Sequence, residues 1–423
     1  MRRLRTRRFT LTAGRVGRLR IALAVLAGLA GCVTPGGVRP QDFPAPVPVP
    51  ISPPDTPALV IDRTRVGPLA LLDQHVLPGS RARLLWRTGQ NYFGADLESP
   101  VLIVHGARPG PVLCLVAGVH GDEINGVETV RRVLSEARPE ALAGTLIGVP
   151  VVNLFGYQRG SRYLPDRRDL NRFFPGSRSG SIASRIAHSF FNAVVRQCDA
   201  LVDFHTGSFD RANLPQVRAD LSRAAVRELA RGFGPTVVLH SPGSRGMLRN
   251  SAVEVGIPAV TFEAGAPTRL QEDEIGTVAA AIERLMAHLG MTAPISPGLT
   301  RPDWGSDQPA LFYASRWLRA EHGGLLISEV ALGEQVEVGQ RLGRIIDPLS
   351  DRIHEVRSNL AGRMLGMAEN QQVLPGFALY HIGLDSDLRS SPDESEPETD
   401  APEENGSDAR EREVSIDPEP EDG

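Results

Sequence analysis

The stretch VLCLVAGVHGDE, which runs from Val112 to Glu123, joins a continuous apolar run to a polar turn. The apolar part ends at Val119 and has the length and composition of a buried strand. His120 and Glu123 follow directly, and two such residues three apart at a strand end can reach one ion. Imidazole nitrogen and carboxylate oxygen are both ordinary zinc ligands. The stretch therefore predicts a strand that delivers part of a metal site.

A second apolar run also ends in a histidine. Leu201 to Phe204 is followed by His205. A catalytic zinc usually has three protein ligands and one open position, so a further ligand is needed downstream of the first pair. His-x-x-Glu alone occurs by chance in many proteins, and the second segment is what makes the metal interpretation stronger. The two segments predict one zinc held by His120, Glu123 and His205.

The segment from 153 to 175 is rich in Arg, Asn and Asp but also carries Tyr and Phe throughout. A guanidinium group matches a carboxylate in bidentate geometry, so Asn171 and Arg172 can hold a substrate carboxylate. Arg162 can instead polarise a carbonyl group. The alternative for this segment is a surface turn held by ion pairs.

Glu263 follows a third short apolar run, Ala259 to Phe262, and precedes Ala264-Gly265. A carboxylate beside a metal-activated water can take its proton and pass that proton to a leaving amine. The alternative is an ordinary charged residue at a strand end.

Together these segments resemble the succinylglutamate desuccinylase/aspartoacylase family, a branch of the zinc carboxypeptidase-like superfamily. The resemblance covers roughly residues 66 to 383, and the matching segments stand in the family's order. They are His120-Gly121-Asp122-Glu123, Arg162-Tyr163, Asp169-Leu170-Asn171-Arg172, Asp203-Phe204-His205-Thr206-Gly207 and Phe262-Glu263-Ala264-Gly265.

The resemblance implies a role for each polar residue in these segments. The zinc ligands would be His120, Glu123 and His205. Glu263 would be the general base and acid, and Arg162 would stabilise the oxyanion. The substrate carboxylate would be bound by Asn171 and Arg172, and Asp169 would orient a ligand histidine from behind.

Apolar strand-like runs alternate with helical stretches between residues 58 and 295, which is typical of an α/β domain. We expect a mixed, largely parallel sheet flanked by helices, as in zinc carboxypeptidase-like folds, with catalytic residues at the strand ends. The expected strands include 145–152 and 200–204, and the expected helices are 181–196, 222–232 and 272–289.

From about 296 to 384 short strands alternate with glycine turns, which predicts a small β-barrel-like domain. Its Val336 to Gly343 is similar to biotinyl and lipoyl carrier barrels, which attach their cofactor to a lysine. The chain contains no lysine, so a carrier role and Schiff-base chemistry on lysine are both excluded.

Residues 1–32 have the layout of a signal peptide, with eight arginines and no acid in the first twenty residues and then a short apolar run. The run is too short for a bilayer-spanning helix, which needs about 20 residues. Leu29-Ala30-Gly31-Cys32 resembles a bacterial lipobox, and the alternative is an ordinary cleaved signal with an incidental cysteine. We expect a lipid on Cys32, export by the Sec or twin-arginine route, and a membrane-anchored protein facing the periplasm.

Proline recurs between residues 33 and 57, which predicts an extended tether. Residues 385–423 hold 16 acids and 3 arginines and few apolar residues, which predicts a disordered acidic tail. With the arginines of the signal peptide removed, the part between these segments is close to neutral. It has no basic patch, so we expect no nucleic-acid partner.

Cys114 and Cys198 both lie in or beside apolar runs. Buried free thiols are the default expectation, because a disulfide cannot be read from cysteine spacing alone.

The expected function is a zinc-dependent amide hydrolase that removes an acyl group from an N-acyl amino acid or a similar carboxylate-bearing amide. It would use a zinc-activated water, with Glu263 as general base and acid. Two alternatives stay open. One is a periplasmic metallocarboxypeptidase or amidase acting on peptides such as cell-wall stem peptides, and the other is a non-catalytic binding lipoprotein.

Overall fold

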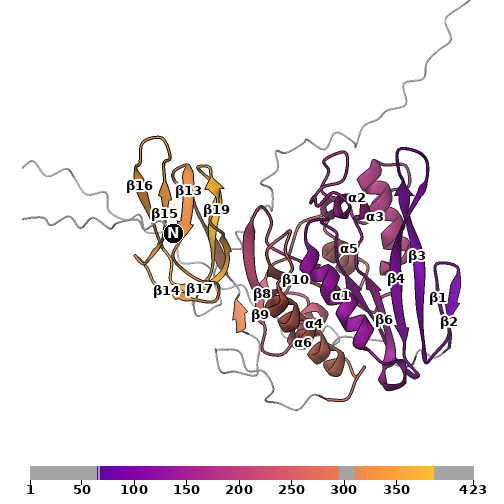
Figure 1. The fold of residues 1–423 in the computed structure, drawn as a ribbon. Coiled ribbons are helices and arrows are strands. Elements are labelled where there is room, and N and C mark those ends of the chain that lie inside the picture. The colour runs from indigo at the N-terminus through magenta and orange to yellow at the C-terminus, as the bar shows by residue number, and fades with distance from the viewer. Residues whose placement is uncertain (1–63, 65–66, 295–309, 313, 385–423) are drawn as a thin grey trace, which may run out of the picture. The chain divides into compact units, whose positions relative to one another are not determined.

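The computed structural model describes residue 64 and residues 67–294, 310–312 and 314–384 (Figure 1). The predicted signal peptide, lipidation site, tether and acidic tail lie outside these residues. Within the described residues, no helix has the length and apolar character needed to cross a membrane.

Four parallel strands form the centre of the main sheet, in the order β6, β5, β7, β10. Their bounds are Ala143–Val149 (β6), Arg108–Val116 (β5), Ala200–His205 (β7) and Ala259–Gly265 (β10). Every residue of β6, β7 and β10 is buried, because helices cover both faces of the sheet. The predicted fold class is confirmed.

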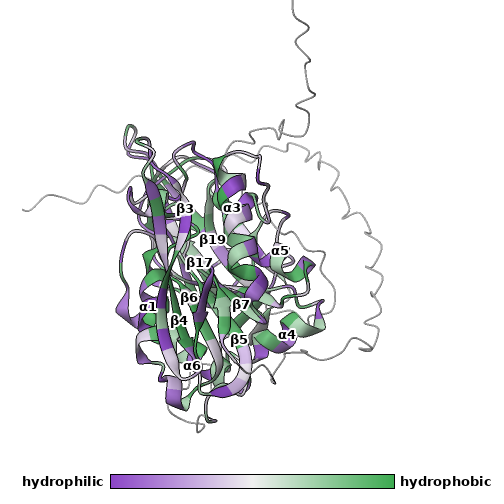
Figure 2. Ribbon diagram, turned by 90° about the vertical axis from the view of Figure 1, so that its right-hand side faces the viewer, coloured by the Kyte–Doolittle hydropathy of each residue, from purple (hydrophilic) through white to green (hydrophobic). Residues whose placement is uncertain are grey.

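Helices pack on both faces of these strands. One face carries α1 (Ile124–Glu136), α4 (Ala224–Arg231) and α6 (Glu272–His288), whose apolar residues share one core. The other face carries α3 (Ile182–Ala193) and α5 (Leu248–Glu254), with a second core. Figure 2 shows α3 and α5 on one side of the strands and α1 on the other.

Antiparallel strands continue the sheet on both sides. Beyond β6 lie β4 (Asp96–His105) and β3 (Ser80–Gln90). Beyond β10 lies β8 (Arg211–Ala219), which pairs with β10 antiparallel.

The C-terminal β region shares the main sheet. Its strand β17 (Gly362–Ala368) pairs with β8, then β19 (Ala378–Leu384) and β12 (Ser315–Arg319) follow. A separate four-stranded sheet completes the region around its own core, in the order β16 (Ile353–Arg357), β15 (Arg341–Ile346), β13 (Gly324–Ser328), β18 (Gln372–Val373). The small β region is present, but its hydrogen-bonded ladder is continuous with that of the catalytic part.

The remaining described elements are short. They are β1 (Leu69–Leu71), β2 (Gln74–Val76), β9 (Val237–His240), β11 (Ala310–Phe312), β14 (Gln335–Val336), α2 (Leu154–Tyr157) and 3-10 turns at Pro139–Ala141, Leu170–Arg172 and Val195–Gln197.

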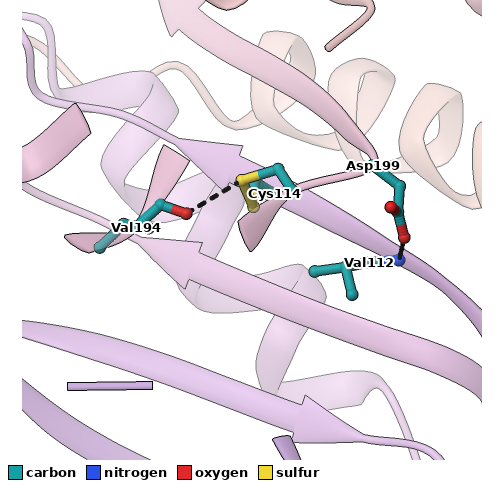
Figure 3. The surroundings of a disulfide bond; sticks show 5 residues. Val112, Cys114, Val194 and Asp199 are labelled. Atoms are coloured by element: carbon teal, nitrogen blue, oxygen red, sulfur yellow. Dashed lines mark hydrogen bonds between the residues drawn. A yellow bond between two sulfur atoms is a disulfide. The ribbon is translucent and has the colours of Figure 1, made fainter. Parts of the chain in front are cut away.

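The expectation of two free thiols is wrong, because Cys114 and Cys198 form a disulfide (Figure 3). Cys114 lies on β5, and Cys198 lies in the segment that leads into β7. These strands are neighbours, so two cysteines 84 residues apart come to a Cα–Cα distance of 5.7 Å. Close by, the Asp199 carboxylate accepts a hydrogen bond from the backbone N–H of Val112 at 2.8 Å.

Candidate metal centre

Three side chains converge where β5 and β7 end. His120 lies in the turn after β5, Glu123 immediately precedes α1, and His205 is the last residue of β7. Because β5 and β7 are parallel neighbours, their ends meet at the same edge of the sheet. One ligand atom from each side chain lies within 4.8 Å of the others, and all three residues are buried.

The turn between the first two candidate ligands is closely packed. A Cβ atom on Gly121 would lie 2.0 Å from the backbone carbon of Gly156, in α2. Only glycine therefore fits at position 121, because any side chain there would push this turn away from the neighbouring helix.

The ring nitrogens of the two histidines divide into an inner and an outer pair. The inner atoms are the Nδ1 atoms, which lie 2.8 Å from the Glu123 carboxylate oxygens and 3.0 Å from each other. The outer Nε2 atoms lie 3.0 Å from the Asp169 carboxylate and 2.9 Å from the Asp203 carboxylate.

This arrangement suits a divalent cation. A carboxylate behind each ring holds the proton on Nε2 and directs the Nδ1 lone pair inward, which is how metal-binding histidines are usually oriented. Two imidazole nitrogens and one carboxylate are a common catalytic zinc set. The residues present therefore fit the metal that the sequence predicts.

The charges around the candidate ligands shift the pKa values of these side chains. Burial by itself lowers the pKa of His205, but Asp203 and Glu123 raise it well above the ordinary value. Burial and Arg162 likewise oppose protonation of His120, and Glu123 and Asp169 outweigh them, so its pKa is raised. Burial raises the pKa of Glu123, but the two histidines hold it far below its usual range. The surroundings of the three candidate ligands thus favour positive charge at the point where they converge.

Arg162 reaches this centre from the loop after α2. One terminal nitrogen lies 3.0 Å from Glu123 Oε1, and the other lies 3.0 Å from Asp169 Oδ2. The side chain is largely buried. Arg162 is thus close enough to contact a group bound at the ligand set, and Asp169 holds both Arg162 and His120 in place.

Glu263 lies one strand further along the same edge. It is directly opposite His205 in the pairing of β10 with β7, and it is buried. Asn213 donates a hydrogen bond to its Oε2 at 3.1 Å, and Arg218 Nε lies 3.6 Å from its Oε1. Both carboxylate oxygens are therefore positioned by β8.

Asn171 and Arg172 lie in a short 3-10 turn, Leu170–Arg172, that is capped by Asp169. The side-chain oxygen of the buried Asn171 accepts a hydrogen bond from the backbone N–H of Leu248 at 2.8 Å. Asn171 therefore fastens this loop to the start of α5. Arg172 is half-buried, and its guanidinium donates to the Asn171 carbonyl at 3.1 Å.

The sequence interpretation missed two residues that touch this centre. Asp203 stands two positions before His205, and this Asp-x-His spacing along a strand was a usable signal because such residues lie on the same face. Asn213 had no local signal, since its contact with Glu263 spans 50 residues and depends on the pairing of β8 with β10.

Comparisons with known proteins agree with this geometry. A family model described as the succinylglutamate desuccinylase/aspartoacylase catalytic domain matches residues 109–289. The N-alpha-acetyl-L-2,4-diaminobutyric acid deacetylase of Halomonas elongata is 31% identical over 257 residues, which make up 59% of this chain and 74% of that protein.

Solved structures show the same fold. A succinylglutamate desuccinylase/aspartoacylase from Rhodobacter sphaeroides has a TM-score of 0.65 at 24% identity, with 72% of this chain and 95% of that chain covered. The product-bound ectoine utilization protein EutE from Ruegeria pomeroyi has a TM-score of 0.64 at 23% identity, with 75% and 98% covered. The resemblance predicted from the ordered segments is confirmed, and this chain belongs to the succinylglutamate desuccinylase/aspartoacylase family of hydrolytic enzymes.

Proposed function

We propose that this protein is a zinc-dependent amide hydrolase that removes an acyl group from an N-acyl amino acid. The observation that carries the proposal is the convergence of His120, Glu123 and His205 on one point, with Glu263 on the adjacent strand. The similarity to a deacetylase of an N-acetylated amino acid supports the substrate class.

Zinc bound by these three residues would polarise the scissile carbonyl and make a water nucleophilic near neutral pH. Glu263 would take a proton from that water and deliver it to the nitrogen as the C–N bond breaks, which leaves a carboxylate and a free amine. The Arg162 guanidinium can stabilise negative charge that develops on the carbonyl oxygen. Asp169 and Asp203 keep the two imidazoles oriented throughout.

Arg172 and the amide nitrogen of Asn171 are proposed to hold the free carboxylate of the amino acid. Such a charged hydrogen bond contributes about 1.5–3 kcal/mol, or roughly ten- to a hundredfold in binding. The test compares kcat/KM for a substrate with a free carboxylate and for the same substrate amidated. The wild type should prefer the acid, and Arg172→Ala should erase the preference. A preference that survives in Arg172→Ala, with only stability lost, would assign Arg172 to its loop.

A lipid-anchored, periplasm-facing location is proposed from Leu29-Ala30-Gly31-Cys32 and the arginine-rich segment before it. The Cys114–Cys198 disulfide supports export, because disulfides persist mainly in oxidising compartments. In the native host, Cys32→Ser should abolish acyl labelling and release the protein from membranes. A mature N-terminus elsewhere, found by mass spectrometry, would refute the lipid anchor.

The same export features favour a second candidate, an amidase or carboxypeptidase that acts on cell-wall stem peptides. A single screen separates the candidates. The zinc-loaded protein without its tail is assayed against N-acyl amino acids and against muropeptides. Hydrolysis of acyl amino acids supports the main proposal, and hydrolysis of muropeptides alone supports the second. Ligand binding with no turnover of either class would support a non-catalytic binding lipoprotein.

A further inference from the structure

Three aromatic side chains surround one buried arginine beside the metal centre. The rings of Phe209, Trp317 and Phe377, called the aromatic cage below, have their centroids 5.8, 5.1 and 5.4 Å from the guanidinium carbon of Arg211. Arg211 is only 8% exposed, whereas the three rings are half-buried. The cage therefore covers the charge and leaves ring surface open.

The cage begins next to the candidate ligands. The Phe209 ring lies 6.0 Å from the guanidinium carbon of Arg162, which in turn contacts Glu123 at 3.0 Å. Phe209 also has a φ of 55°, in the left-handed region that an aromatic residue rarely adopts. Strained conformations of this kind cluster at functional sites. Phe209 thus connects the metal centre to the rest of the cage.

The main sheet brings Trp317 to this place. Trp317 on β12 pairs with His381 on β19, His381 pairs with Gly366 on β17, and Gly366 pairs with Asn213 on β8. Asn213 donates to Glu263. A Cβ atom on Gly366 would lie 2.5 Å from Asn213 Oδ1. Position 366 must therefore lack a side chain for β17 to pair with β8 at this point.

His381 fixes the Trp317 ring. The two rings stack with centroids 4.7 Å apart and an interplanar angle of 5°, and His381 Nε2 lies 2.8 Å from the Ser315 hydroxyl. Burial, together with Arg218 and Arg211, holds the pKa of His381 well below its ordinary value. A neutral imidazole adds no positive charge behind the cage, and its flat face stacks on the Trp317 ring.

The order of the strands assigns the cage to one half of the substrate. In the proposed function the amino acid carboxylate is held by Arg172, in the loop between β6 and α3. In the strand order, the cage lies on the other side of Glu263, where the sheet continues β10, β8, β17, β19, β12. Arg211 is the first residue of β8, and Trp317 lies on β12. A substrate held by its carboxylate at Arg172 would therefore direct its acyl half toward the cage.

We propose that the aromatic cage is the subsite for the acyl half of the substrate, and that it selects a flat apolar acyl group such as an arylacyl group. This assignment rests on the proposed function. The cage presents rings and little charge, because Arg211 donates to the Ser208 carbonyl and hydroxyl oxygens at 2.9 and 3.1 Å and is covered by the rings. Apolar contacts of this kind discriminate by about 10- to 200-fold.

The test uses the N-acetyl, N-succinyl and N-benzoyl derivatives of one amino acid on the zinc-loaded full chain. For the wild type, kcat/KM should be about tenfold or more higher for benzoyl than for acetyl. Trp317→Ala and Phe377→Ala should each lower the benzoyl-to-acetyl ratio several-fold, and Trp317→Phe should retain most of it. Tyr92→Ala is the matched control, because Tyr92 is an aromatic residue that is 90% exposed on the β3–β4 turn. Its ratio should equal that of the wild type.

Three results would overturn the subsite. A ratio unchanged in folded Trp317→Ala and Phe377→Ala would make the cage a structural contact only. A higher kcat/KM for the succinyl derivative than for the benzoyl derivative would show that the Arg211 guanidinium interacts directly with a charged acyl group. Failure of the wild type to hydrolyse any of the three derivatives would overturn the proposed function itself, and the subsite with it. Thermal melts of each variant separate loss of folding from loss of selectivity.

Discussion

His205 and His381 are both buried histidines on strands of the same sheet, but they lie in opposite surroundings. His205 lies between the Asp203 and Glu123 carboxylates, 2.9 and 2.8 Å away, and its pKa is raised well above the ordinary value despite burial. Burial lowers the pKa of His381, and Arg218 and Arg211 lower it further. Burial penalises the charged form in both cases, so neighbouring charges decide the difference.

The difference shows how one sheet supports two kinds of site. Carboxylates around His205 favour a cation at the strand ends, which is what a metal centre requires. Arginines near His381 keep its ring neutral and suited to packing against Trp317.

The largest effect is expected from His205→Ala. Removing one of three ligands should abolish stoichiometric metal binding and reduce hydrolysis to the background rate. Metal content by mass spectrometry and kcat/KM are the measurements. His381→Gln removes an equally buried histidine and should keep the metal. Full activity in His205→Ala, or in chelator-treated wild type, would reject the metal assignment.

Glu263→Gln should separate proton transfer from metal binding. The amide keeps the size of the carboxylate but cannot take a proton, so hydrolysis should fall ~100- to 10,000-fold while the metal stays bound. Metal content by mass spectrometry and kcat/KM are again the measurements. Loss of the metal in this variant would mean that Glu263 is a ligand or supports the fold of the centre.

Asp203→Asn should have a smaller effect. It removes the charge behind His205 and allows the imidazole to turn, which should cost about 10- to 100-fold in metal affinity or activity. Competition with a chromophoric chelator measures the affinity. Asp169→Asn should behave similarly through His120. Unchanged affinity in both variants would show that the inner residues alone orient the rings.

The smallest effect concerns the pH dependence of stability. The folded-state pKa of His381 lies well below 6.5, while the unfolded chain has a pKa near the ordinary value of 6.5. Below pH 6.5 the His381 imidazole takes up a proton in the unfolded chain but stays neutral in the folded chain. Stability is therefore lost as pH falls, at up to about 1.4 kcal/mol per pH unit, until the folded-state pKa is reached.

His381→Gln should remove this contribution. Denaturant melts of both proteins from about pH 7 to about pH 5 should show the free energy of unfolding of the wild type falling relative to that of the variant. The difference isolates His381, because His120 and His205 are present in both proteins. Parallel curves would mean that His381 is protonated in the folded state, contrary to the contrast with His205.

Sequence reasoning succeeded where the relevant pattern was local. Each predicted ligand stands within a few residues of an apolar run, and the parallel arrangement of β5 and β7 brings those run ends together. The expected helix 272–289 corresponds to α6, Glu272–His288. Sequence reasoning failed for Cys114 and Cys198, whose pairing depends on neighbouring strands. It also failed to predict the hydrogen bond between the Asn171 side chain and the Leu248 backbone.

By itself, the sequence determined the order of strands and helices, the candidate ligands and the family, because apolar periodicity and the residues at strand ends act over short distances. The tertiary structure alone decided which groups surround each buried histidine. It also joined β17 to β8, where Gln216 donates to the Leu365 carbonyl across 149 residues. Such contacts depend on the register between strands remote in sequence, and no local pattern encodes that register.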